Sequence, residues 1–299
     1  MPPLVIALRP NQWVKNAIVL AAYFFARWDS TQHASVAGGA ALARVLLAAV
    51  LFCAVSSGIY LINDLRDVES DCAHPVKSRR PIAAGRVSAA AAWTAAAVLL
   101  AFGLAGAWLV APAFGQLAGG YVALQLAYTF WLKRVALLDV FMISAGFVLR
   151  AIGGAVAIDV RISPWLLLCT FLLALFLGLC KRRHEKRLLD DVDAREHRPA
   201  LAGYDERLLD ILIGIAGAST VVAYALYTLS TETVARFGTA RLGLTIPIVV
   251  FGIFRYLDLV YRREEGGRPE KVLLTDRVLL ATVALYALAA LAVFLTARG

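Results

Sequence analysis

The stretch Asn63-Asp64-Leu65-Arg66-Asp67-Val68-Glu69-Ser70-Asp71 follows directly on a long, almost wholly apolar run. The apolar run predicts a membrane-spanning helix. If that helix continues, Asn63, Asp67 and Asp71 lie one turn apart on a single stripe, with Asp64 beside it. Carboxylates this close repel one another unless a cation lies among them. A few carboxylate oxygens suit Mg²⁺, which completes its shell with water and substrate phosphates. We therefore predict a magnesium site at Asn63, Asp64, Asp67 and Asp71.

A cluster of cations follows the aspartates, at Lys77, Arg79 and Arg80. Such side chains bind the outer oxygens of a phosphorylated ligand through charge-assisted hydrogen bonds. A solvated charged loop that caps a span is the alternative interpretation. The regular i, i+4, i+8 spacing of the polar residues, followed by these cations, favours a site that binds both metal and phosphate.

The composition indicates a polytopic membrane protein. The chain has 299 residues, of which 61% are hydrophobic, and its mean hydropathy is +0.73. This apolar share is well above that of soluble domains. The net charge of +9 does not indicate a nucleic-acid partner, because the cations flank apolar runs rather than form a basic surface interleaved with aromatic residues.

Nine apolar segments are long enough to cross a hydrocarbon core of about 30 Å, although the first is marginal. We expect them at residues 14–27, 42–63, 89–111, 115–132, 136–157, 163–180, 208–230, 243–260 and 277–297. The expected fold is therefore all-α, with one domain over residues 1–299 and nine transmembrane helices around a polar cavity that faces the cytoplasm.

The distribution of Lys and Arg predicts the orientation. Twenty-two of these residues lie on the side of the N-terminus and of the aspartates, six on the opposite side, and two within spans. Because cytoplasmic loops carry the excess of cations, the N-terminus and the aspartates are expected on the cytoplasmic side.

Two further segments carry polar residues that are spaced for one helical face. In the first, Arg9, Gln12 and Asn16 share a face and Lys15 lies close to it. They are either contacts to a ligand or an interfacial anchor. In the fifth span, Asp139 and Arg150 are both ionisable and stand three helical turns apart. Ionisable residues inside spans are usually functional, but a structural ion pair is the alternative.

The cytoplasmic ends of other spans carry weaker candidates. These are Lys133 and Arg134 after the fourth span, Lys181, Arg182 and Glu185 after the sixth, and Tyr204 before the seventh. In the eighth span, Arg255, Asp258 and Arg262 form one polar stripe, which either lines the cavity or pairs internally. The stretch 263–271, which contains two glycines and a proline, is expected to be a flexible turn.

The helix count and the aspartate motif resemble the UbiA superfamily of intramembrane prenyltransferases over essentially the whole chain. Three stretches are similar to the decaprenyl-phosphate phosphoribosyltransferases within it: residues 8–16, residues 63–81, and residues 138–151. Aromatic-acceptor members usually carry a second aspartate-rich motif after the sixth helix. The corresponding loop here begins Lys181-Arg182-Arg183-His184-Glu185, which departs from that motif and puts a second Mg²⁺ site in doubt.

The resemblance implies a transfer of phosphoribose from phosphoribosyl pyrophosphate to a polyprenyl phosphate, with release of pyrophosphate. Asp64, Asp67 and Asp71 would be catalytic, through Mg²⁺. The residues expected to bind the substrates are Arg9, Gln12, Lys15, Asn16, Asn63, Lys77, Arg79, Arg80, Lys133, Arg134, Asp139, Arg150, Lys181, Arg182, Glu185 and Tyr204. The resemblance further implies an integral protein of a bacterial inner (plasma) membrane, an active site on the cytoplasmic side, and a homo-oligomer, with a trimer as the expected form.

Two rival functions differ in what they predict. An aromatic prenyltransferase of the same superfamily would use a prenyl diphosphate, but the cations after Asp71 favour a second phosphate. A transporter would line a permeation path with its intramembrane charges. The concentration of polar residues on one side, without detectable inverted repeats, argues against it.

Overall fold

The structure is a computed structural model, and it describes residues 1–32, 38–73, 76–188 and 199–298. In these ranges every regular element is a helix. Seven stretches of this described part are long and apolar enough to cross a membrane, as an integral membrane protein requires. They are α3 (Gly39–Arg66), α5 (Ala89–Val110), α7 (Leu138–Ala157), α8 (Pro164–Leu188), α11 (Glu206–Leu229), η5 with α13 (Arg241–Thr245 and Ile246–Arg262), and α15 (Arg277–Arg298).

The two remaining predicted spans are also helical, but they do not belong to this set of seven. The segment predicted at 14–27 is a 3₁₀ helix, η1 (Pro10–Leu20), followed by a short α2 (Ala21–Ala26). The segment predicted at 115–132 is α6 (Pro112–Phe130), whose glutamines and glycines lower its mean hydropathy. The fold is thus all-helical with seven clear spans, and the count of nine stays a prediction.

Short helices lie mainly at the ends of the long ones. They are α1 (Pro3–Ala7), α4 (Val68–Ala73), η3 (Lys77–Arg79), η4 (Leu132–Arg134), α10 (Pro199–Ala202), α12 (Thr231–Phe237) and α14 (Pro269–Thr275). The last of these corrects the bounds of the turn predicted over 263–271, because residues 263–268 are not helical but residues 269–271 already belong to α14. Pro269 stands at the start of α14 and Glu270 in its first turn, and both residues favour a helix N-terminus.

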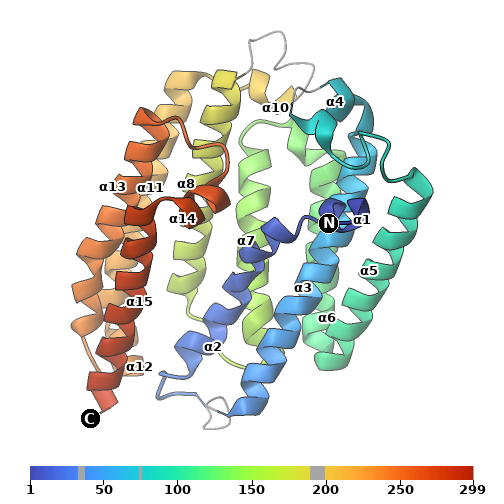
Figure 1. The fold of residues 1–299 in the computed structure, drawn as a ribbon. Coiled ribbons are helices and arrows are strands. Elements are labelled where there is room, and N and C mark those ends of the chain that lie inside the picture. Colours follow the sequence, from blue (N-terminus) through green and yellow to red (C-terminus); the bar gives the residue numbers. More distant parts are fainter. Residues whose placement is uncertain (33–37, 74–75, 189–198, 299) are drawn as a thin grey trace.

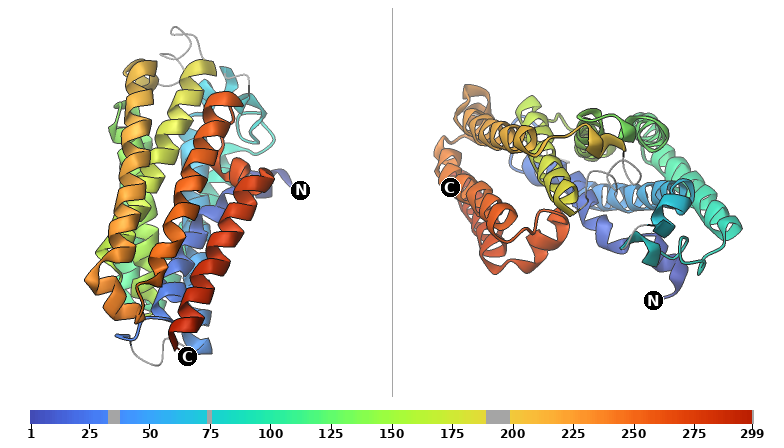
Figure 2. Two further views of the ribbon diagram at one scale, coloured as in Figure 1. Left: turned by 90° about the vertical axis from the view of Figure 1, so that its left-hand side faces the viewer. Right: turned by 90° about the horizontal axis from the view of Figure 1, so that it is seen from above.

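Helices that are consecutive in sequence pack side by side, from α5 through α6, α7 and α8 to α11. Seen along the helix axes, they form a curved row, and α3 and η1 lie on its inner side (Figure 2). On the far side of η1, α13 and α15 pack against each other. One apolar core joins α2, α3, α6 and α7, and a second joins α8, α11, α13 and α15. The end that carries α4 and α10 is the upper end in Figure 1.

A glycine allows η1 to lie directly on α7. A Cβ atom added at Gly154 would come within 2.0 Å of the backbone oxygen of Val19, so a larger residue would push the two segments apart. Close backbone approach of this kind is the usual reason for small residues where membrane helices cross. The contact matters because η1 carries three of the predicted site residues, Gln12, Lys15 and Asn16, and a fourth, Arg9, immediately precedes it.

We predict that Gly154→Ala destabilises the fold by about 1–3 kcal/mol or more, because the added methyl group meets backbone and not a flexible side chain. Thermal unfolding in detergent measures the effect. Gly119→Ala in α6 is the matched control, because nothing lies within 4 Å of its Cβ position and Ala favours a helix by roughly 0.5–1 kcal/mol. Equal melting temperatures for the two variants would contradict this close packing of η1 on α7.

Candidate active site

The predicted stripe of polar residues is present at the end of α3. The helix ends at Arg66, yet the Asp67 amide donates to the Asn63 carbonyl at 3.0 Å and the Asp71 amide donates to the Asp67 carbonyl at 2.8 Å. The chain therefore keeps its helical pitch into α4. Asp64 and Asp71 are each only 2% exposed.

Three cations from three separate segments bind these carboxylates. Arg80, which follows η3, donates from Nη1 to Asp64 Oδ1 at 3.1 Å and to Asp71 Oδ2 at 2.5 Å. Arg9, which immediately precedes η1, also donates to Asp64. Lys133 of η4 donates to both oxygens of Asp67, at 2.5 and 2.7 Å. The structure thus brings together seven of the predicted residues, including Asn63, which donates to Asp67 at 3.2 Å.

The donor set at this end fits a hard divalent cation. In the described ranges no three His, Cys, Asp or Glu side chains lie close enough to hold a metal ion together. However, one nitrogen of Arg80 lies between an oxygen of Asp64 and an oxygen of Asp71, so these two carboxylates already converge on one positive charge. Mg²⁺ typically binds through one or two carboxylates and completes its shell with water and substrate phosphates, so this pair is a donor set that suits it.

A second polar network is buried beside η4 and joins α7 to α8. Asp139 is fully buried and accepts from Arg182 Nε at 2.5 Å, from the Tyr204 hydroxyl at 2.7 Å and from the Val140 amide at 2.9 Å. Arg182 also donates to Glu185 at 2.5 Å. The alternative of an ion pair between Asp139 and Arg150 is therefore wrong, because the neighbouring helix supplies the partner of Asp139.

Tyr204 connects this network to the turn that precedes α7. Its hydroxyl accepts from the Leu137 amide at 2.8 Å, and Leu137 has a left-handed φ of 68°. Burial, together with the hydrogen bond to Asp139, raises the pKa of Tyr204, so its hydroxyl remains a donor at neutral pH. The network thereby fixes the turn that links Lys133 to α7.

Arg150 lies deeper along α7 and forms a separate cluster. Its guanidinium donates to Asn16 at 2.7 Å, to Tyr121 at 2.6 Å and to the carbonyl of Gly146 at 3.2 Å. Asn16 in turn donates to Cys53 of α3 at 3.2 Å. This cluster joins η1, α3, α6 and α7.

Glu270 is a site residue that the sequence did not predict. It accepts from Gln12 at 2.8 Å and so links α14 to η1. Burial alone would raise the pKa of Glu270, but the positive charge of Lys15 and the hydrogen bond from Gln12 together hold it below its usual value. In the sequence, the Pro-Glu pair at the start of α14 is typical of a helix N-terminus, and it was the signal available for this helix.

The structure leaves other predicted residues outside these contacts. Arg79 and Arg134 are exposed, and Lys77 is half-buried in η3. Lys181 lies 3.9 Å from Glu185. In α13, Arg255 pairs with Asp258 at 3.0 Å and with Asp276 at 2.7 Å, which favours the internal-pairing alternative for that stripe. The charged stretch 190–198 lies outside the described residues.

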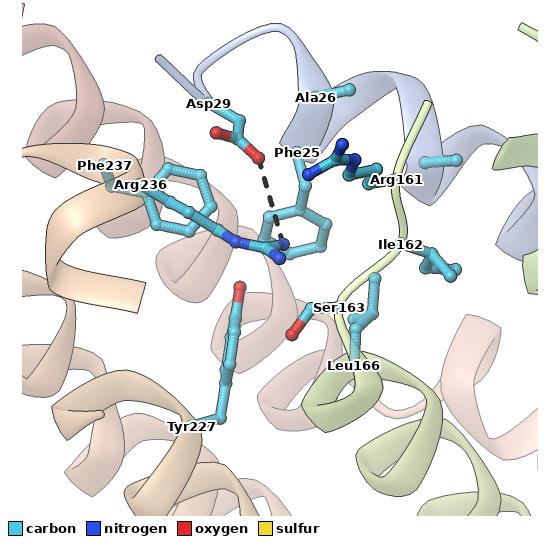
Figure 3. A pocket seen from close by; sticks show the side chains of 11 residues that line it. Phe25, Ala26, Asp29, Arg161, Ile162, Ser163, Leu166, Tyr227, Arg236 and Phe237 are labelled. Carbon is cyan, nitrogen blue, oxygen red and sulfur yellow. Dashed lines mark ion pairs between the residues drawn. The ribbon is translucent and has the colours of Figure 1, made fainter. Parts of the chain in front are cut away.

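A pocket at the opposite end of the bundle does not contain the predicted residues. Asp29, at the end of the α2 segment, faces Arg236 of α12 across it at 3.9 Å (Figure 3). Arg236 also pairs with Glu232 at 2.6 Å, so its charge is matched by carboxylates. This pocket is separate from the aspartate end.

Comparisons with known proteins agree on one family. Residues 18–275 match the model of the UbiA prenyltransferase family. Decaprenyl-phosphate phosphoribosyltransferase of Mycolicibacterium smegmatis is 36% identical over 292 residues, which cover 92% of this chain and 87% of the relative. The protein of the same name from Mycobacterium tuberculosis is 36% identical over 92% of this chain and 89% of its own length. A UbiA homolog from Archaeoglobus fulgidus, solved with GPP and Mg²⁺, superimposes with a TM-score of 0.72 at 19% identity and covers 98% of this chain and 99% of its own.

We predict that Tyr204→Phe lowers stability by about 1–3 kcal/mol, because Asp139 and the Leu137 amide each lose a buried partner. Denaturation in detergent with a tryptophan or thiol probe measures this loss. Tyr261→Phe is the control, since the Tyr261 hydroxyl also donates to a carboxylate, that of Asp210, but belongs to an exposed residue. Equal losses in both variants would show that the buried network adds no stability of its own.

Proposed function

The chain belongs to the UbiA prenyltransferase family, and from this membership we propose that it is a Mg²⁺-dependent polyprenyl-phosphate phosphoribosyltransferase. It transfers phosphoribose from phosphoribosyl pyrophosphate to a polyprenyl phosphate, and it releases pyrophosphate. The observation that carries the choice of substrates is the 36% identity, over 92% of the chain, to relatives named decaprenyl-phosphate phosphoribosyltransferase. The aspartates and cations at one end of the helical bundle support the chemistry.

The proposed chemistry separates a metal-binding role from a phosphate-binding role. Asp64 and Asp71 would hold Mg²⁺, with Asp67 and Asn63 beside them, and the ion would supply stabilisation of negative charge on the leaving pyrophosphate. Arg80 and Arg9, which bind these carboxylates in the structure, then turn to phosphate oxygens of the sugar substrate. Lys77, Arg79, Lys133 and Arg134 supply further cations at the same end.

The acceptor needs little activation. A lipid phosphate is anionic at pH 7, so it attacks the ribose C1 carbon without a strong general base. That carbon gains oxocarbenium character as the pyrophosphate leaves, as in glycoside chemistry. The protein therefore contributes mainly by orienting the two substrates, which is worth several kcal/mol in such reactions, about 7 or more in favourable cases.

The proposal also includes the membrane topology and the assembly of the protein. Residues 1–299 form one domain of nine membrane-spanning segments, in which η1–α2 and α6 add to the seven clear spans. The excess of cations places the aspartate end on the cytoplasmic side of a bacterial inner membrane. A homo-oligomer, expected to be a trimer, completes the assembly.

Incubation of the purified protein with radiolabelled phosphoribosyl pyrophosphate, polyprenyl phosphate and Mg²⁺ tests the function through a labelled lipid product. The alternative is an aromatic prenyltransferase, which would use a prenyl diphosphate; GPP, with which the Archaeoglobus fulgidus homolog was solved, is a compound of that class. Product from a prenyl diphosphate and 4-hydroxybenzoate, with none from the first pair, would establish the alternative.

We predict that Asp64→Ala, Asp67→Ala and Asp71→Ala each lower kcat/KM by about 100-fold or more without unfolding the protein. The transfer assay at saturating Mg²⁺ measures this loss. Glu69→Ala is the matched control, because Glu69 lies on α4 between the aspartates but is exposed. Retained activity in the aspartate variants would remove the metal assignment.

We further predict that Arg80→Ala raises the KM for phosphoribosyl pyrophosphate about tenfold or more, since one charge-assisted hydrogen bond is worth about 1.5–3 kcal/mol. Some loss of kcat is expected as well, because remote binding energy orients the reacting carbon. Arg66→Ala is the control, since Arg66 lies between the aspartates in sequence but is exposed. A rise in the KM of the lipid alone would place Arg80 at the acceptor.

A further inference from the structure

Arg150 is a buried charge that carbonyl, amide and phenol oxygens contact but do not neutralise. The residue is 4% exposed, and its three hydrogen bonds go to Asn16, Tyr121 and the Gly146 carbonyl. Its guanidinium also lies over the rings of Tyr121 and Phe147, at 4.8 and 5.3 Å from their centroids. None of the ion pairs among the described residues includes Arg150.

The other arginines and the lysine of the two buried networks do have carboxylate partners. Arg9 binds Asp64, and Arg80 binds both Asp64 and Asp71. Lys133 binds Asp67, and Arg182 binds Asp139 and Glu185. Burial of a charge without an opposite charge beside it is strongly unfavourable. A guanidinium inside a span is therefore expected to have an anionic partner, and a ligand can supply it.

The residues around Arg150 fix the position of its guanidinium. Tyr121 accepts from Arg150 and also from Gln125 at 3.0 Å, so its position is fixed from two sides. The Gly146 carbonyl accepts from Nη1 at 3.2 Å and holds the guanidinium from a third side. Three of the five N–H groups of the guanidinium make the hydrogen bonds within the described chain, and a phosphate oxygen suits the remaining two.

The depth of the cluster distinguishes it from the aspartate end. Arg150 follows Asp139 by 11 residues, or about 16 Å along α7, and its side chain turns back by about one helical turn to reach Gly146. The guanidinium thus lies roughly 10 Å deeper in the bundle than Asp139. In the N-terminal segment, Lys15 stands between Arg9, which binds Asp64, and Asn16, which accepts from Arg150.

We propose that Arg150, held by Asn16, Tyr121 and Gly146, is an anion subsite for the phosphate monoester of a substrate, separate from the pyrophosphate position at the aspartates. The assignment rests on the proposed function, in which both substrates carry such a group: the 5-phosphate of the sugar and the phosphate of the lipid. Asn16 and Tyr121 act as positioning residues, because they orient the guanidinium.

The test compares Arg150→Gln with native protein in nanodiscs. The expected result is a rise of at least about tenfold in the KM of one substrate, measured with the other at saturation. A rise for polyprenyl phosphate identifies the lipid as the source of the phosphate, and a rise for phosphoribosyl pyrophosphate identifies the sugar. Unchanged KM values for both, with only a lower melting temperature, would overturn the proposal.

Two further variants keep the test decisive. Arg150→Lys retains the charge but cannot reproduce the three hydrogen bonds, so this variant should bind substrate better than Arg150→Gln. If Arg150 had only a structural role, the two variants would bind substrate equally poorly. Arg255→Gln is the matched control, because Arg255 also lies within a span but pairs with Asp258 and Asp276. It should lower stability and leave both KM values within about twofold, since no ligand depends on it.

Direct binding separates this proposal from the proposed reaction. Labelled polyprenyl phosphate and labelled ribose 5-phosphate are the probes, without the second substrate. If the native protein gives no transfer product but binds one probe, and Arg150→Gln loses that binding about tenfold or more, the subsite stands although the reaction does not. If the native protein transfers phosphoribose and Arg150→Gln binds both probes as the native protein does, the subsite is wrong.

Discussion

The balance of charge at buried carboxylates organises the aspartate end of this protein. Asp64 and Asp71 are almost inaccessible to water, so a negative charge on either is costly unless a cation lies beside it. Arg9 arrives from the N-terminal segment and Arg80 from the loop after α4, and they meet on the same carboxylate. Two segments far apart in sequence are thereby held together at one point of the bundle. A metal ion that takes over the carboxylates would release both arginines toward its phosphate ligands.

The local sequence pattern was sufficient to predict much of the aspartate end of the bundle. An apolar run long enough for a membrane predicted α3, and the spacing of Asn63, Asp67 and Asp71 predicted the stripe, which the backbone hydrogen bonds confirm. Both features depend only on helical geometry, which acts between residues close in sequence. The count of spans was harder, because η1 and α6 carry polar and small residues that weaken the apolar signal.

The partners of the ionisable residues could not be predicted from spacing. Asp139 and Arg150 stand three turns apart on nearly the same face, but that distance is too long for contact along one helix. A helical side chain turns toward the N-terminus of its helix, so Arg150 reaches Gly146, while Arg182 enters from the next helix to bind Asp139. The role of Glu270 was equally inaccessible, because its partner Gln12 is 258 positions away in sequence.

The 3₁₀ geometry of η1 explains how one short segment serves both levels of the site. Such a helix rises about 2.0 Å per residue, against about 1.5 Å in an α-helix. The seven steps from Arg9 to Asn16 therefore span about 14 Å, where an α-helix would span about 10 Å. Arg9 lies at Asp64 and Asn16 at Arg150, with Gln12 at Glu270 between them. With three residues per turn, Gln12 and Lys15 lie one above the other, which brings both toward α14. An α-helical η1 would shorten this span and rotate these side chains apart, so the stretched geometry is what lets a single segment contact the aspartates, Glu270 and the deeper guanidinium together.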